Sequence, residues 1–339
     1  MTRRNRRTIT RVCVIVLFFT VATRADAATR YVTDTGSDGP GCGLALTSAC
    51  RSITQAIAVA AAGDIVLVGA GRYGDLNRNG VLGDIAGEET GSPGCGCVLS
   101  INKHVIVLSS SGAAVTIIDG RSVDTNGTVL LITGAGEFGR PAKGFTVTAT
   151  ARATSYGIAL DAGNVLVRGN QVIYSGSSAS TGTGIVTVND AAVRLEGNQV
   201  LNWAIGIAGR GAAIVSKNQV MLNELGIYAT GGTVVGNVAT ANLVGIRVRG
   251  AVSLTTNAAS INRFEGFNFS LDFSGVFTRN DMFANDCGVF SDTSTLKATN
   301  NYWGVATGPG APPADDICGA GATTTPFATK PFIVKPLKP

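Results

Sequence analysis

The chain contains few charged residues and a single histidine. Charged side chains make up 14% of the 339 residues, against about 25% in an average protein. Because His104 is the only histidine, any mechanism that needs two histidines is excluded, including a multi-histidine metal centre. Glycine, by contrast, is abundant with 45 residues, and hydrophobic residues make up 45% of the chain. This hydrophobic content argues against intrinsic disorder.

The first 27 residues have the features of a secretory signal peptide. A basic start precedes an apolar run from Val12 to Ala22, and Ala25-Asp26-Ala27 has the small residues of a cleavage site. The run is too short to cross a bilayer, which needs about 20 residues, so no membrane span is expected after its removal. Six of the 27 basic and one of the 22 acidic residues lie here. The remainder therefore carries no net charge, and we expect a secreted protein, extracellular or periplasmic, without a nucleic-acid partner.

Six cysteines lie outside the signal peptide, an even number that favours disulfides in an oxidising compartment. They are Cys42, Cys50, Cys95, Cys97, Cys287 and Cys318. We expect Cys42–Cys50 to close a small loop near the mature start and Cys287–Cys318 to brace the far end. The middle two lie too close together to be assigned. A zinc site is not indicated, because the spacing of paired cysteines or histidines that it requires is absent.

An internal repeat runs through the second half of the chain. A glycine followed by an apolar residue recurs at Gly157, Gly184, Gly206, Gly226, Gly245, Gly266 and Gly288. Each is followed, 11 to 14 residues later, by an asparagine: Asn170, Asn198, Asn218, Asn237, Asn257, Asn280 and Asn300. A second series comes five residues after four of these, at Asn223, Asn242, Asn262 and Asn285. Three columns in register indicate equivalent positions of a repeated unit.

Each repeat unit is built from short strands and turns. Alternating stretches such as residues 246–249 are typical of half-buried strands, and no unit has room for a helix of ten residues. A unit of about twenty residues cannot bury its own apolar face and must stack on its neighbours. We therefore predict an all-β parallel solenoid, with strands pairing from coil to coil at ~4.8 Å and asparagines satisfying one another's buried polar groups. A leucine-rich repeat is excluded, because leucine is sparse and the helical half is missing.

The two ends of the solenoid are expected to be capped. Weaker strand patterns precede the repeat at Ile65–Val68, His104–Leu108, Val115–Ile118, Val129–Ile132 and Phe145–Val147. Before them, helical spacing of apolar residues predicts a capping helix over about 52–62. Seven of the ten prolines follow Gly308, so residues 305–339 are predicted to form a cap that does not continue the strand pairing. Residues 28–339 would thus form one domain, in which the lone histidine has a structural role.

Motifs near both ends share a pattern with known proteins. They are Cys50–Ile57, Gly63–Val68, Ile117–Gly120, Gly144–Val147 and Asn300–Gly304. In these segments the chain resembles secreted bacterial proteins of the pectate-lyase-like, right-handed parallel β-helix superfamily, over about residues 30–335. The resemblance implies the fold but no single activity, since members include pectate lyases, polygalacturonases and proteins with no known reaction. The chain lacks the Trp-x-Asp-His signature of the lyases and the Gly-His-Gly signature of the polygalacturonases.

Successive side chains of a strand point to opposite faces, and this period of two identifies the residues on the outer face. If Ile246 and Val248 point inward, Arg247 and Arg249 point outward. The same register gives a first outward column of Ala159, Val186, Ala208, Tyr228, Arg247, Asn268 and Phe290. The second column is Asp161, Val188, Arg210, Thr230, Arg249, Ser270 and Asp292.

These columns predict a binding face but no pair of catalytic carboxylates. They bring together Arg210, Tyr228, Arg247, Arg249 and Asn268. Arginine binds carboxylates and sulfates through a planar fork, so the sequence indicates a site for an acidic polysaccharide or another surface polymer, with an ordinary solvated face as the alternative. Asp161 and Asp292 lie six coils and about 29 Å apart, too far for a glycosidase pair.

A second candidate site is a metal loop in the first half of the chain. Residues 75–80 match the first half of a calcium loop, D-x-[DN]-x-[DN]-G. The twelfth position should be glutamate and is Ala86, so Asp84, Glu88 or Glu89 would have to replace it. Calcium is therefore the one cofactor to consider, on Asp75, Asn77, Asn79 and Asp84. A polar, turn-rich loop without a metal is the alternative.

Three functions remain compatible with the sequence. The first is a secreted, non-catalytic β-helix, acting as a monomer, that binds a polysaccharide or surface polymer. The second is a polysaccharide lyase or glycoside hydrolase acting on uronic-acid polymers, the lyase being the more expected class if the protein is an enzyme. The third is a structural or adhesive surface protein. The absence of catalytic signatures favours the first.

Overall fold

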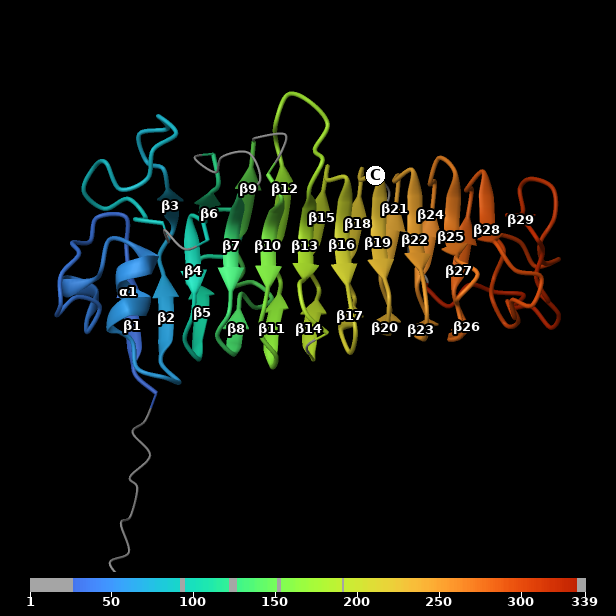
Figure 1. Cartoon of the computed structure of the whole chain (residues 1–339), viewed down its shortest axis with the longest axis horizontal. Coiled ribbons are helices and arrows are strands. Elements are labelled where there is room, and N and C mark those ends of the chain that lie inside the picture. Colours follow the sequence, from blue (N-terminus) through green and yellow to red (C-terminus); the bar gives the residue numbers. More distant parts are fainter. Residues whose placement is uncertain (1–26, 92–94, 122–126, 151–153, 191, 334–339) are drawn as a thin grey trace, which may run out of the picture.

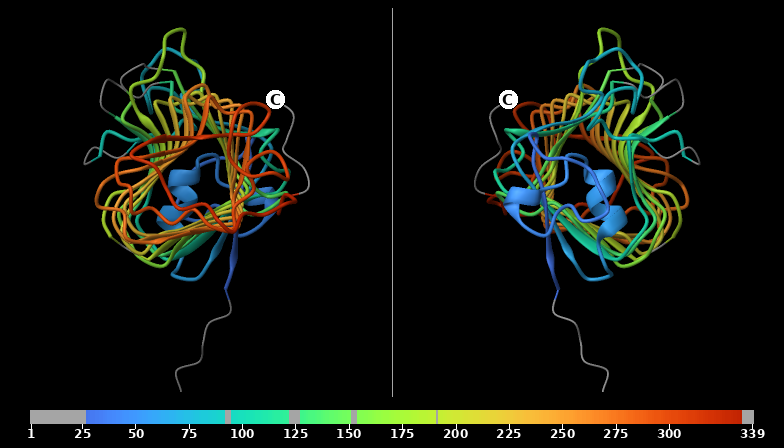
Figure 2. Two further views of the ribbon diagram at one scale, coloured as in Figure 1. Left: turned by 90° about the vertical axis from the view of Figure 1, so that its right-hand side faces the viewer. Right: turned by 90° about the vertical axis from the view of Figure 1, so that its left-hand side faces the viewer.

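The alternating apolar stretches form short strands that pair in parallel from coil to coil. The computed structural model describes residues 27–91, 95–121, 127–150, 154–190 and 192–333, so the predicted signal peptide lies almost wholly outside the described residues. The chain folds into a long right-handed parallel β-helix with three parallel sheets (Figure 1). Seen along its long axis, the sheets enclose a core that is covered at one end by a short helix (Figure 2). None of the helices in the described residues has the length and apolar character that a membrane crossing requires.

Each coil contributes one strand to each sheet in turn. Sheet 1 contains β1 (Thr29–Val32), β2 (Ile65–Val68), β5 (Val105–Ser109), β8 (Gly136–Phe138), β11 (Val165–Arg168), β14 (Val193–Glu196), β17 (Ile214–Ser216), β20 (Gly232–Val235), β23 (Val252–Thr255) and β26 (Val276–Thr278). Sheet 2 contains β3 (Gly71–Gly74), β6 (Thr116–Asp119), β9 (Thr146–Ala149), β12 (Gln171–Tyr174), β15 (Gln199–Leu201), β18 (Gln219–Met221), β21 (Val238–Thr240), β24 (Ala258–Ser260) and β27 (Asp281–Phe283). Sheet 3 contains β4 (Leu99–Ile101), β7 (Thr128–Ile132), β10 (Tyr156–Leu160), β13 (Thr183–Thr187), β16 (Ile205–Gly209), β19 (Leu225–Ala229), β22 (Val244–Val248), β25 (Glu265–Phe269), β28 (Cys287–Ser291) and β29 (Ile317–Gly319).

The core is made of columns of inward-facing side chains. In sheet 1 one such column runs through Val167, Leu195, Val215, Val234 and Leu254, all of which are buried. Full burial of one such side chain stabilises the fold by roughly 1.5–3 kcal/mol. Because every coil repeats these contacts, the stability of the solenoid is distributed along its length.

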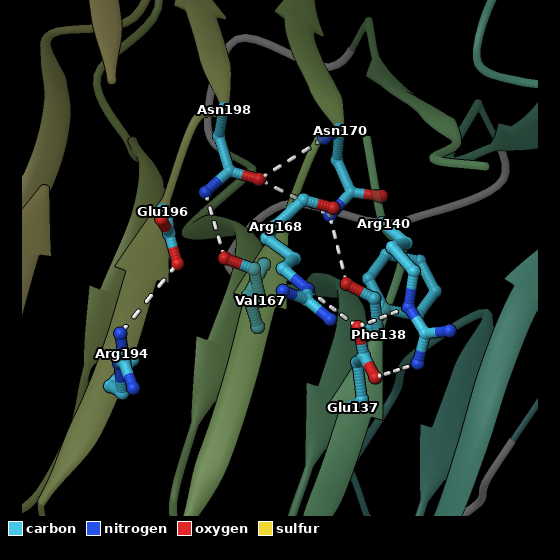
Figure 3. Close-up of polar contacts among 9 residues, drawn as sticks. All are labelled: Glu137, Phe138, Arg140, Val167, Arg168, Asn170, Arg194, Glu196 and Asn198. Atoms are coloured by element: carbon cyan, nitrogen blue, oxygen red, sulfur yellow. Dashed lines mark hydrogen bonds and ion pairs between the residues drawn. The ribbon is translucent and has the colours of Figure 1, made fainter. Parts of the chain in front are cut away.

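The first asparagine ladder lies between sheets 1 and 2. At its start, Asn170 donates from its backbone N (3.1 Å) and from Nδ2 (3.2 Å) to Oδ1 of Asn198 (Figure 3). The Nδ2 of Asn198 in turn donates to the carbonyl oxygen of Val167 at 2.9 Å. The same pattern recurs in each later coil, so side chains that are fully buried still satisfy their polar groups.

The last member of this ladder is Asn301, not Asn300 as the spacing predicted. Asn301 is buried, and its Oδ1 accepts from the backbone N of Asn280 at 2.8 Å. Asn300 instead takes the left-handed conformation, with φ of 58°. The residue before each ladder asparagine has the same conformation, as at Gly236 (φ 67°). Asparagine tolerates the left-handed backbone conformation better than most residues. Asn300 can therefore form the turn while Asn301 forms the ladder.

The second ladder lies between sheets 2 and 3 and ends in two different residues. Asn223, Asn242, Asn262 and Asn285 are linked in order by bonds of 2.8–3.1 Å. At its N-terminal end, Trp203 occupies the corresponding position, and its Nε1 donates to the carbonyl of Val172 at 3.2 Å. At its C-terminal end, Asn285 donates from Nδ2 to the Asp315 carboxylate at 2.5 Å. A carboxylate from the tail therefore completes the ladder.

The N-terminal end is covered by α1 (Ile53–Val59), within the range expected for the capping helix, after a short 3-10 turn at Leu46–Ser48. The Ser52 hydroxyl accepts from the backbone N of Gln55, as an N-cap does. The helix ends where Ala60 takes an extended backbone, and Lys103 caps it there, because its Nζ donates to three carbonyl oxygens, including that of Ala60 at 3.1 Å. Ile53 and Ile57 are buried against the first coils.

The C-terminal tail does continue the strand pairing, contrary to the prediction for residues 305–339. β29 pairs in parallel with β28 in sheet 3, and the Cys287–Cys318 disulfide joins the two strands. Ile317–Gly319 contains no proline, so its backbone donors remain available, and the prolines lie on either side. The described residues also contain the disulfides Cys42–Cys50 and Cys95–Cys97.

Candidate functional site

A groove lies on the outer face of sheet 3, in the C-terminal half of the solenoid. Parallel register brings Tyr228, Arg247, Asn268 and Phe290 side by side in consecutive strands. The neighbouring outward position adds Arg249, whose backbone N bonds to Ala229. Inward positions between them are fully buried, as the period of two predicted. The groove has a volume of about 700 Å³, and we call it the arginine groove.

The two arginines of the groove differ in their partners. Arg249 forms an ion pair with Asp272 at 3.4 Å; both side chains are about half exposed. The hydrogen bonds that Arg249 donates to Asp272 and to Tyr228 raise the pKa of its guanidinium. Arg247 is half-buried, and its Nε donates to Oδ1 of Asn268 at 3.2 Å. Within the described part of the chain no carboxylate forms an ion pair with Arg247, although Asp292 lines the same groove.

The hydrogen bonds of Asn268 fix the direction of the Arg247 side chain. Asn268 is only 8% exposed, and its Nδ2 donates to Oε2 of Glu265 at 2.9 Å. This bond leaves Oδ1 directed at the guanidinium of Arg247. An arginine held in this way loses less side-chain entropy on binding than a free one.

One predicted residue lies outside the groove, and several lining residues were not predicted. Arg210 is exposed in the outer column of sheet 3 but does not line the groove. Leu271 and Asp272 do line it, because the connection from β25 to β26 is longer than that from β22 to β23. The long spacing of 14 residues between Gly266 and Asn280 is the sequence signal for this insertion.

The outer face of sheet 3 changes from apolar to polar along the solenoid. Ala159, Val186 and Ala208 form a small apolar cluster in the same column that contains Tyr228 and Arg247. Ile205 packs against this cluster and also lines the groove. In this column the polar residues therefore begin at Tyr228, where the arginine groove lies.

Buried carboxylates elsewhere have structural partners. Burial raises the pKa of Glu137, but hydrogen bonds from Arg140 and Arg168 outweigh this effect, so its pKa is lowered (Figure 3). Asp281 accepts from the backbone N of Phe332 (3.0 Å) and of Ile333 (2.7 Å), which fixes the tail against β27.

In the predicted metal loop Asp84 contacts Asn77 and Asn79, whereas both oxygens of Asp75 accept from the backbone. Asp75 is fully buried and accepts from the backbone N of Asn79 (3.2 Å) and of Gly80 (2.7 Å). Asp84 accepts from Nδ2 of Asn77 at 3.1 Å and from Nδ2 of Asn79. The bond from Asn79 is the main reason that the pKa of Asp84 is lowered. The four residues predicted as ligands thus lie in one loop.

Glu88 and Glu89, the two other acidic candidates, have separate roles. Glu88 is 2% exposed and points into the metal loop, where Oε1 accepts from the backbone N of Leu76 at 2.9 Å. Glu89 accepts from the backbone N of Ile53 (2.7 Å) and of Thr54 (2.8 Å) at the start of α1. Burial raises the pKa of Glu89. Two consecutive residues thus connect the metal loop to the N-terminal cap.

Comparisons with known proteins identify similar folds only. No protein-family model matches the chain, and neither does any curated protein. The structure is similar to that of a pectate lyase, Pel9A, with a TM-score of 0.57 and 12% identity over 89% of this chain and 80% of that one. It is equally similar to a rhamnogalacturonan lyase, with a TM-score of 0.57 and 12% identity over 91% of this chain and 90% of that one. The chain thus shares the pectate-lyase-like fold.

Proposed function

We propose that this pectate-lyase-like β-helix binds an acidic polysaccharide in the arginine groove. The observation that supports the proposal is Arg247, a half-buried guanidinium held by Asn268 without a carboxylate partner in the described residues. The column from Tyr228 to Phe290 spans three strand spacings, about 14 Å, which suits several sugar units lying along the solenoid. Both structural neighbours are named as polysaccharide lyases, in accord with a polysaccharide partner.

Replacing Arg247 with alanine is expected to weaken the binding of a polyuronate about 10- to 100-fold. The reason is the loss of charge-assisted hydrogen bonds, each contributing about 1.5–3 kcal/mol. Calorimetric titration with oligogalacturonate would measure the change. Arg210→Ala is the matched control, because Arg210 lies on the same face outside the groove and its loss should change the affinity less than twofold. Equal losses in both variants would contradict the proposed site.

Catalysis by β-elimination is the second candidate function, because both structural neighbours are lyases. Incubation with uronic-acid polymers, with and without calcium, would yield products with an unsaturated bond that absorb ultraviolet light. If the wild type degraded the polymer and the Arg247→Ala variant did not, the arginine groove would have a lyase function and not a binding function alone. Binding without turnover would support the first proposal and exclude the second for the polymers tested.

We also propose that the metal loop binds calcium and thereby stabilises the N-terminal cap. Support comes from the oxygen atoms of Asp75, Asn77, Asn79, Asp84 and Glu88, which are the ligand types that calcium prefers. Asn77 and Asn79 donate to Asp84 in the present arrangement, so their side-chain amides must rotate to offer oxygen to the ion. Since Glu89 accepts from the start of α1, an ordered loop would also hold the helix.

Calcium at 100 times its dissociation constant is expected to raise the thermal midpoint by about 5 °C. The effect should be absent in Glu88→Gln and small with magnesium, which prefers a smaller octahedral site. Differential scanning calorimetry with calcium, magnesium or chelator would measure these shifts. An unchanged midpoint in all three conditions would show that the loop is a polar turn without a metal.

Export to an oxidising compartment is proposed together with this function. The three disulfides of the described residues would persist there, whereas the cytosol reduces such bonds. A single chain presents the complete groove, so we propose that the monomer binds the polymer. Mass spectrometry of the secreted protein should find an N-terminus at Ala28 and no free thiols.

A further inference from the structure

A turn at the edge of the arginine groove presents the carboxylate of Asp272. Residues 270–275 connect β25 to β26, whereas residues 249–251 make the same connection one coil earlier. The backbone N of Phe273 donates to the carbonyl oxygen of Ser270 at 3.0 Å, which closes a β-turn around Leu271 and Asp272. Both side chains at the tip of this turn line the groove.

The turn is fixed to the solenoid on its C-terminal side. The Phe273 ring packs edge-on against Phe269, with ring centroids 4.8 Å apart. A Cβ on Gly275 would lie 1.8 Å from the carbonyl oxygen of Val252, so this close approach to the preceding coil requires glycine. The backbone therefore sets the position of the Asp272 carboxylate, and an ion pair is not needed to hold it at the groove.

The Asp272 carboxylate meets Arg249 as the carboxylate of a ligand would. Nη2 of Arg249 lies 3.4 Å from Oδ2 of Asp272, and both side chains are about half exposed to the groove. A second hydrogen bond from the same guanidinium goes to Tyr228. A guanidinium binds a carboxylate in the same way whichever molecule carries it. A uronate that approaches Arg249 therefore competes with Asp272.

Arg247 lies two residues earlier and has no such competitor. Its Nε donates to the neutral side chain of Asn268, and it forms no ion pair within the described residues. Residues two apart in an extended strand are separated by about 7 Å, so both arginines are within reach of one ligand. The groove thus holds one arginine that is open to a ligand carboxylate and one that a protein carboxylate occupies.

Asp292 is a second acidic residue of the groove, and it differs from Asp272 in its contacts. It is exposed and forms no ion pair within the described part of the chain. It lies in the outward column of Arg249, two coils further along the solenoid and about 10 Å away. The two aspartates therefore bring the same charge to the groove, but only Asp272 pairs with an arginine.

We propose that Asp272 is an internal competitor, which occupies Arg249 in the free protein and which an acidic polysaccharide must displace to gain that arginine. This inference rests on the function proposed for the groove and assigns to Asp272 a part in setting its affinity. On displacement, Arg249 turns from Asp272 to the ligand and holds it together with Arg247. Because one ion pair replaces another, Arg249 adds little to the affinity of the wild type.

The test is a double-mutant cycle on the full mature chain, with calorimetric titration of an oligogalacturonate. Asp272→Asn keeps the size of the side chain and removes its charge, so we expect the affinity to rise about two- to fivefold, in the range of an exposed ion pair. Arg249→Ala should weaken binding about two- to fivefold more in the Asp272→Asn protein than in the wild type. Only in the variant is the guanidinium free for the ligand.

Asp292→Asn is the matched control, because it removes the same charge from the same groove without breaking the pair with Arg249. Its gain in affinity should be below about twofold and should persist when Arg249→Ala is added. Equal gains from the two asparagine variants would overturn the inference, since the charge of the groove would then explain both. Weaker binding by Asp272→Asn would overturn it too, because the carboxylate would then position Arg249 for the ligand. Failure of the wild type and all variants to bind would instead contradict the proposed function itself.

Discussion

Replacement of Asn237 by alanine is expected to lower the free energy of unfolding by about 4 kcal/mol. Asn237 is fully buried in the middle of the first ladder, and its Oδ1 accepts from the backbone N (2.9 Å) and the Nδ2 (3.0 Å) of Asn218. Its Nδ2 donates to the carbonyl of Val215 at 2.8 Å and to Oδ1 of Asn257 at 2.9 Å. Alanine would leave these groups buried without their partner, and each such loss costs about 1–3 kcal/mol.

The matched control for Asn237→Ala is Asn300→Gly. Asn300 is exposed, and glycine accepts its left-handed backbone without strain, so this variant should differ from the wild type by less than about 0.5 kcal/mol. Urea-induced unfolding followed by far-ultraviolet circular dichroism would measure both. A loss below about 1 kcal/mol for Asn237→Ala would contradict the view that the ladder stabilises the coil. A large loss of stability for Asn300→Gly would instead indicate that the Asn300 side chain belongs to the ladder.

The fold followed from the sequence wherever the pattern was periodic. Inward Ile246 and Val248 and outward Arg247 were placed correctly, because a period of two leaves only two sides for a strand residue. The distinction between Asn300 and Asn301 was not accessible in this way. It depends on which residue takes the left-handed turn, and both side chains have the same polar groups.

The features missed by the sequence analysis lie where the period is interrupted. Asp272 reaches Arg249 from an extended connection. The position of such a connection depends on contacts between coils and not on its own residues. The calcium-loop pattern left Asp84, Glu88 and Glu89 as possible replacements for its twelfth residue. The structure separates the two glutamates, because Glu89 accepts a hydrogen bond from the start of α1 and Glu88 accepts one from the metal loop.

The proline-rich composition of the tail conceals β29 in the sequence. The three residues from Ile317 to Gly319 contain none, and they pair with β28 beside the Cys287–Cys318 disulfide. A short segment needs only its own backbone donors to join a sheet. Beyond β29, Thr323 also forms a parallel bridge with Lys297, so the tail pairs at more than one point between its prolines.

Asp315→Asn is expected to stabilise the protein near pH 7.5 by up to about 3 kcal/mol. The Asp315 side chain is 2% exposed, and burial raises its pKa to about 6, from 3.8 in the unfolded chain. The hydrogen bonds from Asn285 lower the pKa but do not outweigh the burial, and within the described residues no basic side chain pairs with Asp315. Above pH 6 the folded protein therefore keeps a buried charge that the second ladder only partly compensates.

The sign of the pH dependence follows from the raised pKa. The folded state holds a proton on Asp315 that the unfolded state has lost between about pH 4 and pH 6. This group therefore contributes its full stability below about pH 4, and the contribution falls as the pH rises through about 6. Asparagine has no such titration, so the difference between the two proteins should be small at pH 4 and reach its maximum above pH 6.

Asparagine at position 315 would also extend the ladder that Asn285 now ends. Its Oδ1 would replace the carboxylate as the acceptor for Asn285, and its Nδ2 would face the carbonyl of Met282, which continues the column of carbonyls used by earlier members. Asp315→Ala, by contrast, removes the acceptor and should destabilise the protein at every pH. Urea unfolding of the three proteins between about pH 4 and pH 7.5 would separate these effects. If the wild-type and Asp315→Asn curves ran parallel over this range, the carboxylate would not titrate in the folded state, and the buried charge would not be the reason for any difference between them.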